Sequence, residues 1–243
     1  MMKKIVKFIL IFCTIIFLFG SCEVGVSKEA ELEKGAIVYS NLNKIGDDCN
    51  AIIEAIEDAW YFSIYKADNY YSANSIISAF SEYTGIYEYN VKAGVEDYLG
   101  SDYYSYSSKY STDAIYCAML SEVDCAVSVV TYSVRGSLDK MHNLLNDAQQ
   151  YLKDMSDKYD SDTQYSNLKK YYSEIKSFLD FCTSPTGSYS ELGTTKRDFK
   201  ENTKRYKNEL SIIYNWLVKS KSLLFGTCFL STNCDLFRIH KAI

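Results

Sequence analysis

The sequence has very little proline and histidine, and each scarcity limits what the chain can do. Pro185 is the single proline in 243 residues, so long helices can run without the break that this residue imposes. His142 and His240 are the only histidines, which is too few for the usual catalytic and zinc-binding constellations. The chain also has no glycine-rich phosphate loop, nucleotide fingerprint or nucleophile elbow. We therefore expect no catalytic site, no metal and no cofactor.

The sequence also lacks a basic run. Its 26 lysine and arginine residues stand against 31 aspartate and glutamate residues, which gives a net charge of −5. Nucleic-acid binding needs clustered positive side chains on the phosphate backbone, so we expect no nucleic-acid partner. The same balance offers no electrostatic attraction to anionic lipid headgroups.

The first 22 residues consist of a basic start and one apolar run, and they end at a cysteine. Three lysines come first, an apolar run covers residues 9–19, and Gly20 and Ser21 stand before Cys22. A basic start, a short apolar segment and small residues are typical of an export signal. The four residues from Phe19 to Cys22 resemble the lipobox of bacterial lipoproteins, in which the cysteine is acylated and becomes the new N-terminus. Phe19 keeps the bulky apolar class of that position, where leucine is more common.

The resemblance implies a signal peptide over residues 1–21 and a lipidated tether over residues 22–30. The protein would be exported to the bacterial cell envelope and held at a membrane by more than one acyl chain on Cys22. Loss of three lysines with the signal peptide would take the net charge from −5 to −8. An ordinary cleaved signal peptide and an uncleaved N-terminal anchor remain the alternatives.

Between residues 31 and 225 the apolar residues recur every three or four positions, which indicates helix faces. Short connections make successive helices antiparallel neighbours, so we expect an all-α fold, an up-down antiparallel bundle of three to four long helices. Residues 115–134 are apolar nearly all round, which predicts burial on several sides. The first helix is expected over residues 27–66, with a weak point at Gly46, and a second helix over 112–158 as one spine. A third helix is expected from a capping box at Ser161–Gln164 to residue 183, and a fourth from a second capping box at Ser188–Glu191 onward.

A tyrosine-rich segment interrupts this pattern over about residues 84–111, and we expect it to be an irregular insert in the bundle. Residues 86–91 alternate as a short strand does, although they also fit a helix. Residues 101–111 are polar and are expected to form a loop. Residues 226–243 lose periodicity and are expected to be a C-terminal tail.

Six cysteines remain once Cys22 and the signal peptide are set aside, and an even number in an exported chain permits disulfides. Cys228 and Cys234 are close enough in sequence to close a small loop. Cys49 and Cys182 lie on apolar helix faces, where each can be a plain buried thiol. No Cys-x-x-Cys spacing indicates a metal site.

The tyrosines are the best candidates for a binding surface. The chain has 23 of them, and Tyr103, Tyr104, Tyr106 and Tyr110 alternate with serine and aspartate. Tyrosine offers rigid, amphipathic contact area at a low cost in entropy, which suits recognition surfaces. The alternative is that these residues only cover the bundle, with their hydroxyls in solvent.

From these features we expect a lipid-anchored cell-envelope protein with a non-catalytic binding role and a protein partner. The alternative is a lipoprotein that captures a sugar or a peptide for a transporter. Capture proteins usually need a cleft between domains, and this chain shows no α/β pattern that would supply one.

Overall fold

A computed structural model describes residues 23–159 and 162–224. This part of the chain forms eight α-helices and one short 3-10 helix, with no strand among the described residues. The expectation of an all-α fold is confirmed. The lipobox at Cys22, the capping serine at 161, the cysteines Cys228 and Cys234 and the tail over 226–243 lie outside the described residues.

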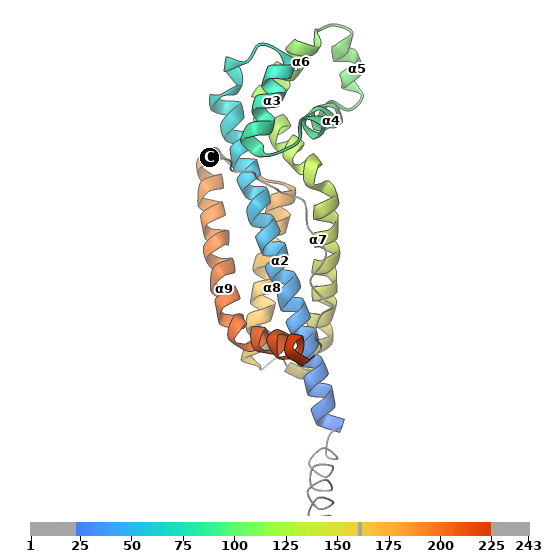
Figure 1. Ribbon diagram of the computed structural model, residues 1–243, viewed down its shortest axis with the longest axis vertical. Helices are drawn as coiled ribbons and strands as arrows, with labels where there is room; N and C mark the ends of the chain where they lie inside the picture. Colours follow the sequence, from blue (N-terminus) through green and yellow to red (C-terminus); the bar gives the residue numbers. More distant parts are fainter. Residues whose placement is uncertain (1–22, 160–161, 225–243) are drawn as a thin grey trace, which may run out of the picture.

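Four long helices lie side by side along the long axis of the molecule (Figure 1), and we call them the body. Tyr151 of one helix donates to the carbonyl of Glu31 at 3.0 Å, and Ser63 donates to the carbonyl of Leu120 at 3.0 Å. Glu31 lies near the start of the first body helix and Tyr151 near the end of the second, whereas Ser63 lies at the end of the first and Leu120 just precedes the start of the second. These two body helices are therefore antiparallel. The body consists of α2 (Glu23–Tyr65), α7 (Val123–Tyr159), α8 (Thr163–Thr183) and α9 (Tyr189–Leu224).

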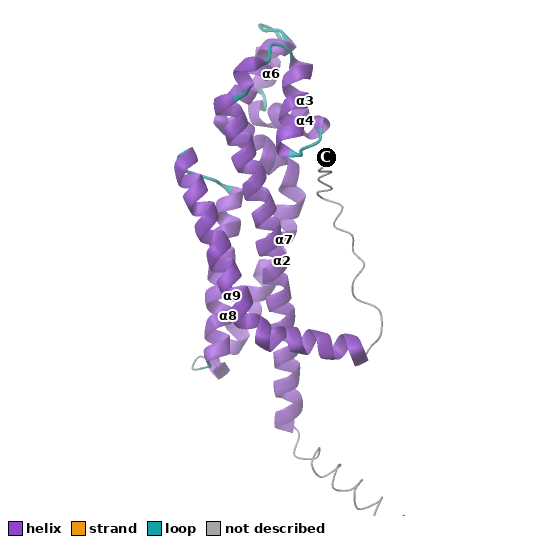
Figure 2. Cartoon of the chain, turned by 60° about the vertical axis from the view of Figure 1, so that its left-hand side comes forward, coloured by secondary structure: helices purple, strands orange, loops and turns teal. Residues whose placement is uncertain are grey.

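The remaining helices gather at the end of the body where α2 ends and α7 begins (Figure 1). We call residues 67–121 the cap. Within it, α4 (Glu88–Leu99) packs on α7, and α3 (Ala73–Thr84) packs on α2 and on α6 (Thr112–Ser121). The Glu23 end of α2 and the cap therefore lie at opposite ends of the molecule, as Figure 2 also shows. The cap contains η1 (Ala67–Asn69), α3 (Ala73–Thr84), α4 (Glu88–Leu99), α5 (Asp102–Ser107) and α6 (Thr112–Ser121).

The expectation of an irregular segment over 84–111 is wrong for most of its length, because α4 and α5 occupy it. The strand interpretation of residues 86–91 is wrong. The loop expected over 101–111 is wrong for residues 102–107, which form α5, whereas residues 108–111 are outside any helix. The serines of this stretch fold back on the helix backbone: Ser107 and Ser108 donate to the carbonyls of Tyr104 and Ser105 at 3.1 Å and 2.9 Å. Such local bonds satisfy polar side chains within a short helix.

The single spine expected over 112–158 is also wrong. The helix breaks at Glu122, whose backbone is extended, and α6 and α7 are bent by 93° at the break. If residues 112–158 formed one straight helix, the first part of the apolar segment over 115–134 would extend beyond the end of the body. The bend instead packs α6 on α3, so that Tyr116, Leu120 and Val129 are buried in one core.

Two helix starts illustrate how side chains supply the missing partners of the first backbone N–H groups. At α8 the cap is Asp162, whose Oδ1 accepts from the N–H groups of Gln164 and Tyr165 at 2.8 Å and 3.1 Å. The expected start is therefore shifted by one residue. At α9 the expected capping box is confirmed, because Ser188 N–H donates to Glu191 Oε2 at 2.6 Å and Glu191 N–H to Ser188 Oγ at 3.4 Å.

Glycines allow close approaches between helices at two levels. A Cβ at Gly46 would lie 2.9 Å from Ile175 Cδ1 of α8, so this residue brings two helices together and α2 continues through it. A Cβ at Gly94 of α4 would lie 3.0 Å from the Cα of Val129 in α7. The cap is thus seated on the body by a contact that has no room for a methyl group.

We predict that Gly94→Ala lowers the free energy of unfolding by about 1 to 3 kcal/mol, because backbone at Val129 cannot swing aside from the added methyl group. Gly136→Ala is the matched control in α7, where a Cβ meets nothing within 4 Å. That change should raise stability by about 0.5 to 1 kcal/mol through helix propensity. Urea unfolding of both variants measures the difference, and equal stabilisation by both would contradict the close seating of α4.

Candidate binding surface

The four tyrosines expected to form a binding surface lie together on α5 and the turn after it. Tyr104 is 80% exposed, Tyr106 and Tyr110 are exposed, and Tyr103 is half-buried. Their rings form two pairs, with centroids 6.1 Å apart for Tyr103 and Tyr104 and 6.0 Å apart for Tyr106 and Tyr110. These residues are therefore available at the surface, with Tyr103, Tyr104 and Tyr106 on a helix instead of the expected loop.

Tyr103 is the member of this group that connects to the interior of the cap. It lies next to Tyr116 of α6, whose hydroxyl donates to Glu96 Oε1 of α4 at 3.0 Å. Burial, the Glu96 carboxylate and the Tyr103 hydroxyl all raise the pKa of Tyr116. Tyr103 is thus linked to a part-buried hydrogen bond between α4 and α6.

Three further tyrosines of the cap are highly exposed and were not singled out from the sequence. Tyr71 is 86% exposed, ahead of α3, and Tyr87 and Tyr89 are exposed at the start of α4. The rings of Tyr87 and Tyr89 stack with centroids 5.8 Å apart and an interplanar angle of 14°. Their alternation fits a strand face as well as a helix start, so the sequence did not show that both would be exposed.

A cluster of four tyrosines lies at the junction of cap and body, and we call it the neck cluster. Its members are Tyr61 and Tyr65 of α2, Tyr83 of α3 and Tyr189 of α9. The Tyr61 ring centroid lies 4.9 Å from that of Tyr65, 6.3 Å from that of Tyr83 and 6.4 Å from that of Tyr189. Tyr65 and Tyr83 are exposed. The cluster joins segments far apart in sequence, which periodicity alone does not bring together.

The neck cluster already holds one cation of the chain. The Nζ atom of Lys66 lies 5.7 Å from the centroid of the Tyr61 ring, in the arrangement of a cation–π contact. Burial, Glu57 and the neighbouring Tyr65 raise the pKa of Tyr189. The phenol of Tyr189 therefore keeps its proton near pH 7, and its ring lies beside negative charge.

The cap as a whole is acidic. Residues 67–121 contain seven acidic side chains against two lysines. Asp97 pairs with Arg135 of α7 at 2.8 Å, and Asp113 accepts from the N–H of Ala73 at 2.7 Å. The other carboxylates of this segment give the exposed tyrosines a negative surrounding.

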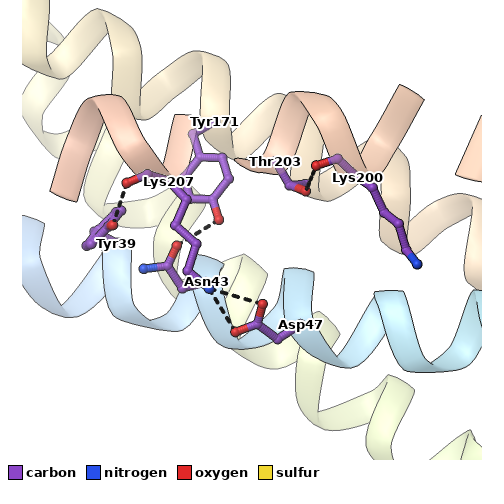
Figure 3. Close-up of polar contacts among 7 residues, drawn as sticks. All are labelled: Tyr39, Asn43, Asp47, Tyr171, Lys200, Thr203 and Lys207. Carbon is purple, nitrogen blue, oxygen red and sulfur yellow. Dashed lines mark hydrogen bonds and ion pairs between the residues drawn. The ribbon is translucent and has the colours of Figure 1, made fainter. Parts of the chain in front are cut away.

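A second population of tyrosines is buried in the body and serves its packing. Tyr39 donates to the carbonyl of Lys207 at 2.8 Å, and Tyr171 donates to Asn43 Oδ1 at 2.8 Å (Figure 3). The ring of Tyr214 stacks on that of Tyr39 with centroids 5.3 Å apart. Burial raises the pKa of Tyr214 to about 12. These rings are structural and are not offered to a partner.

Ion pairs line the outer edge of the contact between α2 and α9. Lys207 pairs with Asp47 at 3.0 Å (Figure 3), Lys200 pairs with Glu54 at 2.6 Å, and Lys196 pairs with Glu57. The first two pairs are exposed, and pairs of that kind contribute little to stability, whereas the third is part-buried. They do fix the antiparallel register of the two helices, because each step along α2 meets an earlier residue of α9.

Neither a metal site nor a membrane span is evident in the part of the chain that the structure describes. No group of three metal-ligating side chains gathers there. No single helix in those ranges has both the length and the hydropathy of a membrane span, and only the bent pair of α6 and α7 passes that test jointly.

Comparison of the chain with protein-family models, curated proteins and solved structures finds no match. The functional interpretation therefore rests on the residues themselves.

We predict that Tyr214→Phe weakens the loss of stability at alkaline pH. The raised pKa means that the folded state holds the phenol proton more tightly than the unfolded chain does. The stability that this group contributes is complete below about pH 10 and falls as the pH rises toward 12.

At pH 11 the fall due to this one phenol should be about 1 kcal/mol, and urea unfolding at pH 8 and pH 11 measures it. Tyr104→Phe, a change at an exposed ring, is the control and should keep the full fall. An identical pH dependence in the wild-type chain and in Tyr214→Phe would contradict the burial of this phenol.

Proposed function

We propose that the protein is a lipid-anchored, non-catalytic binding protein of the bacterial cell envelope, in which an up-down antiparallel bundle presents the tyrosine-bearing cap to a protein partner. The observation that supports this most strongly is the placement of the two ends. The cap lies at one end of the body, and Glu23, which directly follows Cys22, lies at the other.

The length of α2 sets how far the cap stands from the lipid. The helix runs from Glu23 to Tyr65 and has 43 residues. At about 1.5 Å per residue it covers roughly 65 Å. Acylation at Cys22 would hold the lower end at the membrane surface, and the exposed tyrosines would then face away from it, toward other molecules.

The chemistry of the cap favours a partner with basic side chains. Exposed tyrosine faces accept lysine and arginine through cation–π contacts, and the surrounding carboxylates add electrostatic complementarity. The molecule uses the same contact internally, since the guanidinium of Arg135 lies 4.9 Å from the centroid of the Tyr132 ring. A lysine- or arginine-bearing protein surface therefore fits the cap better than an acidic one.

Site-specific photo-crosslinking in intact cells tests this function. A benzophenone amino acid replaces Tyr104 in the cap in one chain, and replaces Gln149, an exposed residue of α7, in the matched control. We expect a discrete protein adduct from position 104 and none from position 149. The adduct should weaken at high salt, because part of the attraction is electrostatic.

A variant with Tyr87→Ser and Tyr89→Ser tests whether the surrounding tyrosines contribute. Both rings are exposed, so folding should be unaffected, while the yield of the adduct from position 104 should fall several-fold. Equal adducts from positions 104 and 149, or an adduct from position 149 alone, would overturn the assignment of the cap as the binding end.

A further inference from the structure

Two buried thiols meet inside the body, where α2 passes α8. Cys49 and Cys182 are both fully buried. The Cys182 thiol donates to the backbone carbonyl of Cys49 at 3.5 Å, and the two side chains are hydrogen-bonding partners. No disulfide joins them in this structure.

The helices approach closely at this level. A Cβ at Gly46, one turn before Cys49, would lie 2.9 Å from Cδ1 of Ile175, which lies two turns before Cys182 on α8. A disulfide needs Cα atoms about 4.4 to 6.8 Å apart, closer than most helix pairs come. The absent Cβ of Gly46, one turn before Cys49, lets α2 and α8 approach closely at the level where the two cysteines meet.

The surroundings keep the folded pair unreactive. The Cys182 thiol and burial both raise the pKa of Cys49, so Cys49 is not present as the thiolate that attacks a disulfide. Leu42, Ile45 and Ile53 shield the same face of the core from solvent. Oxidation of this pair must therefore precede closure of the core, while the chain is still folding.

We propose that Cys49 and Cys182 are joined by a disulfide in the exported protein. This inference rests on the export that the proposed function includes, because disulfides persist in oxidising compartments. The oxidant is itself a disulfide, that of a thiol–disulfide oxidoreductase. One cysteine thiolate attacks it to give a mixed disulfide and one free thiol, and the second cysteine displaces the other oxidant sulfur. Two cysteine thiols become one disulfide, and the oxidant leaves as a dithiol.

The bond would join α2 to α8 across a separation of 133 residues in sequence. The closed loop contains the whole cap and α7, so the crosslink would restrict the unfolded chain strongly. It would hold the body together without touching any exposed tyrosine of the cap.

Mass spectrometry of the protein from its own cells tests the proposal. The full chain is taken from the membrane fraction, denatured in acid, alkylated without reductant and digested. We expect a linked pair of peptides that contain Cys49 and Cys182, while Cys125, a buried thiol elsewhere in the core, is alkylated. Alkylation of both Cys49 and Cys182 in membrane-bound protein would overturn the disulfide and leave the anchoring proposal intact. Recovery in the cytosol with all thiols free would overturn export, and the disulfide with it.

Thermal unfolding with and without dithiothreitol gives a second, independent readout. The wild-type chain should lose roughly 5 to 15 °C of Tm on reduction. A variant with Cys49→Ala and Cys182→Ala should show no effect of the reductant, whereas Cys125→Ala, the matched control, should keep the wild-type shift. A reductant effect that persists in the double variant, or that disappears in Cys125→Ala, would contradict the assignment of this pair.

Discussion

Helix α2 contacts each of the other three body helices, and the apolar side chains that it buries on several sides determine where each of them lies. Leu42, Ile45, Ile53 and Ile56 are all fully buried, so the face of α2 that carries them must be covered by other helices. The burial of each such side chain is worth about 1.5 to 3 kcal/mol, far more than an exposed ion pair. The packing of α7, α8 and α9 around this helix follows from that requirement.

The same helix also sets the position of the cap. Its last turns carry Phe62, whose ring meets that of Phe80 in α3 edge to face with centroids 5.3 Å apart. Ser63 is buried and donates to carbonyls of both α2 and α6. Because the far end of α2 lies next to Cys22 in sequence, one continuous helix connects the proposed anchor to the proposed binding surface.

The regular parts of this fold could be predicted from the sequence because local patterns decide them. The stripe through Val130, Val134, Leu138 and Met141 is buried as its spacing indicates, and the capping box at Ser188 forms. The break at Glu122 could not be predicted, since it depends on which distant helices pack against the apolar segment over residues 115–134. At the start of α8, Asp162 and its serine neighbour are both good capping residues, so the sequence alone did not decide which of the two caps the helix.

The candidate surface shows a similar division. The exposure of Tyr104, Tyr106 and Tyr110 agrees with their polar neighbours in sequence, whereas the neck cluster needs the three-dimensional meeting of Tyr61 and Tyr189. Composition alone could not separate these rings from the buried tyrosines of the body. The distinction depends on which helix faces are covered, and only packing between distant segments decides that.

The most direct test of the account is the orientation of the molecule on a membrane. The acylated chain is reconstituted in vesicles whose headgroups carry a fluorescence quencher, with a fluorescent amino acid at Lys34 or at Tyr104. Both positions are exposed. Lys34 lies near the Glu23 end of α2, and Tyr104 lies in the cap at the other end of the molecule. We predict strong quenching at position 34, little at position 104, and none at either position in the Cys22→Ala chain. Equal quenching at both positions of the acylated chain would contradict the display of the cap away from the membrane.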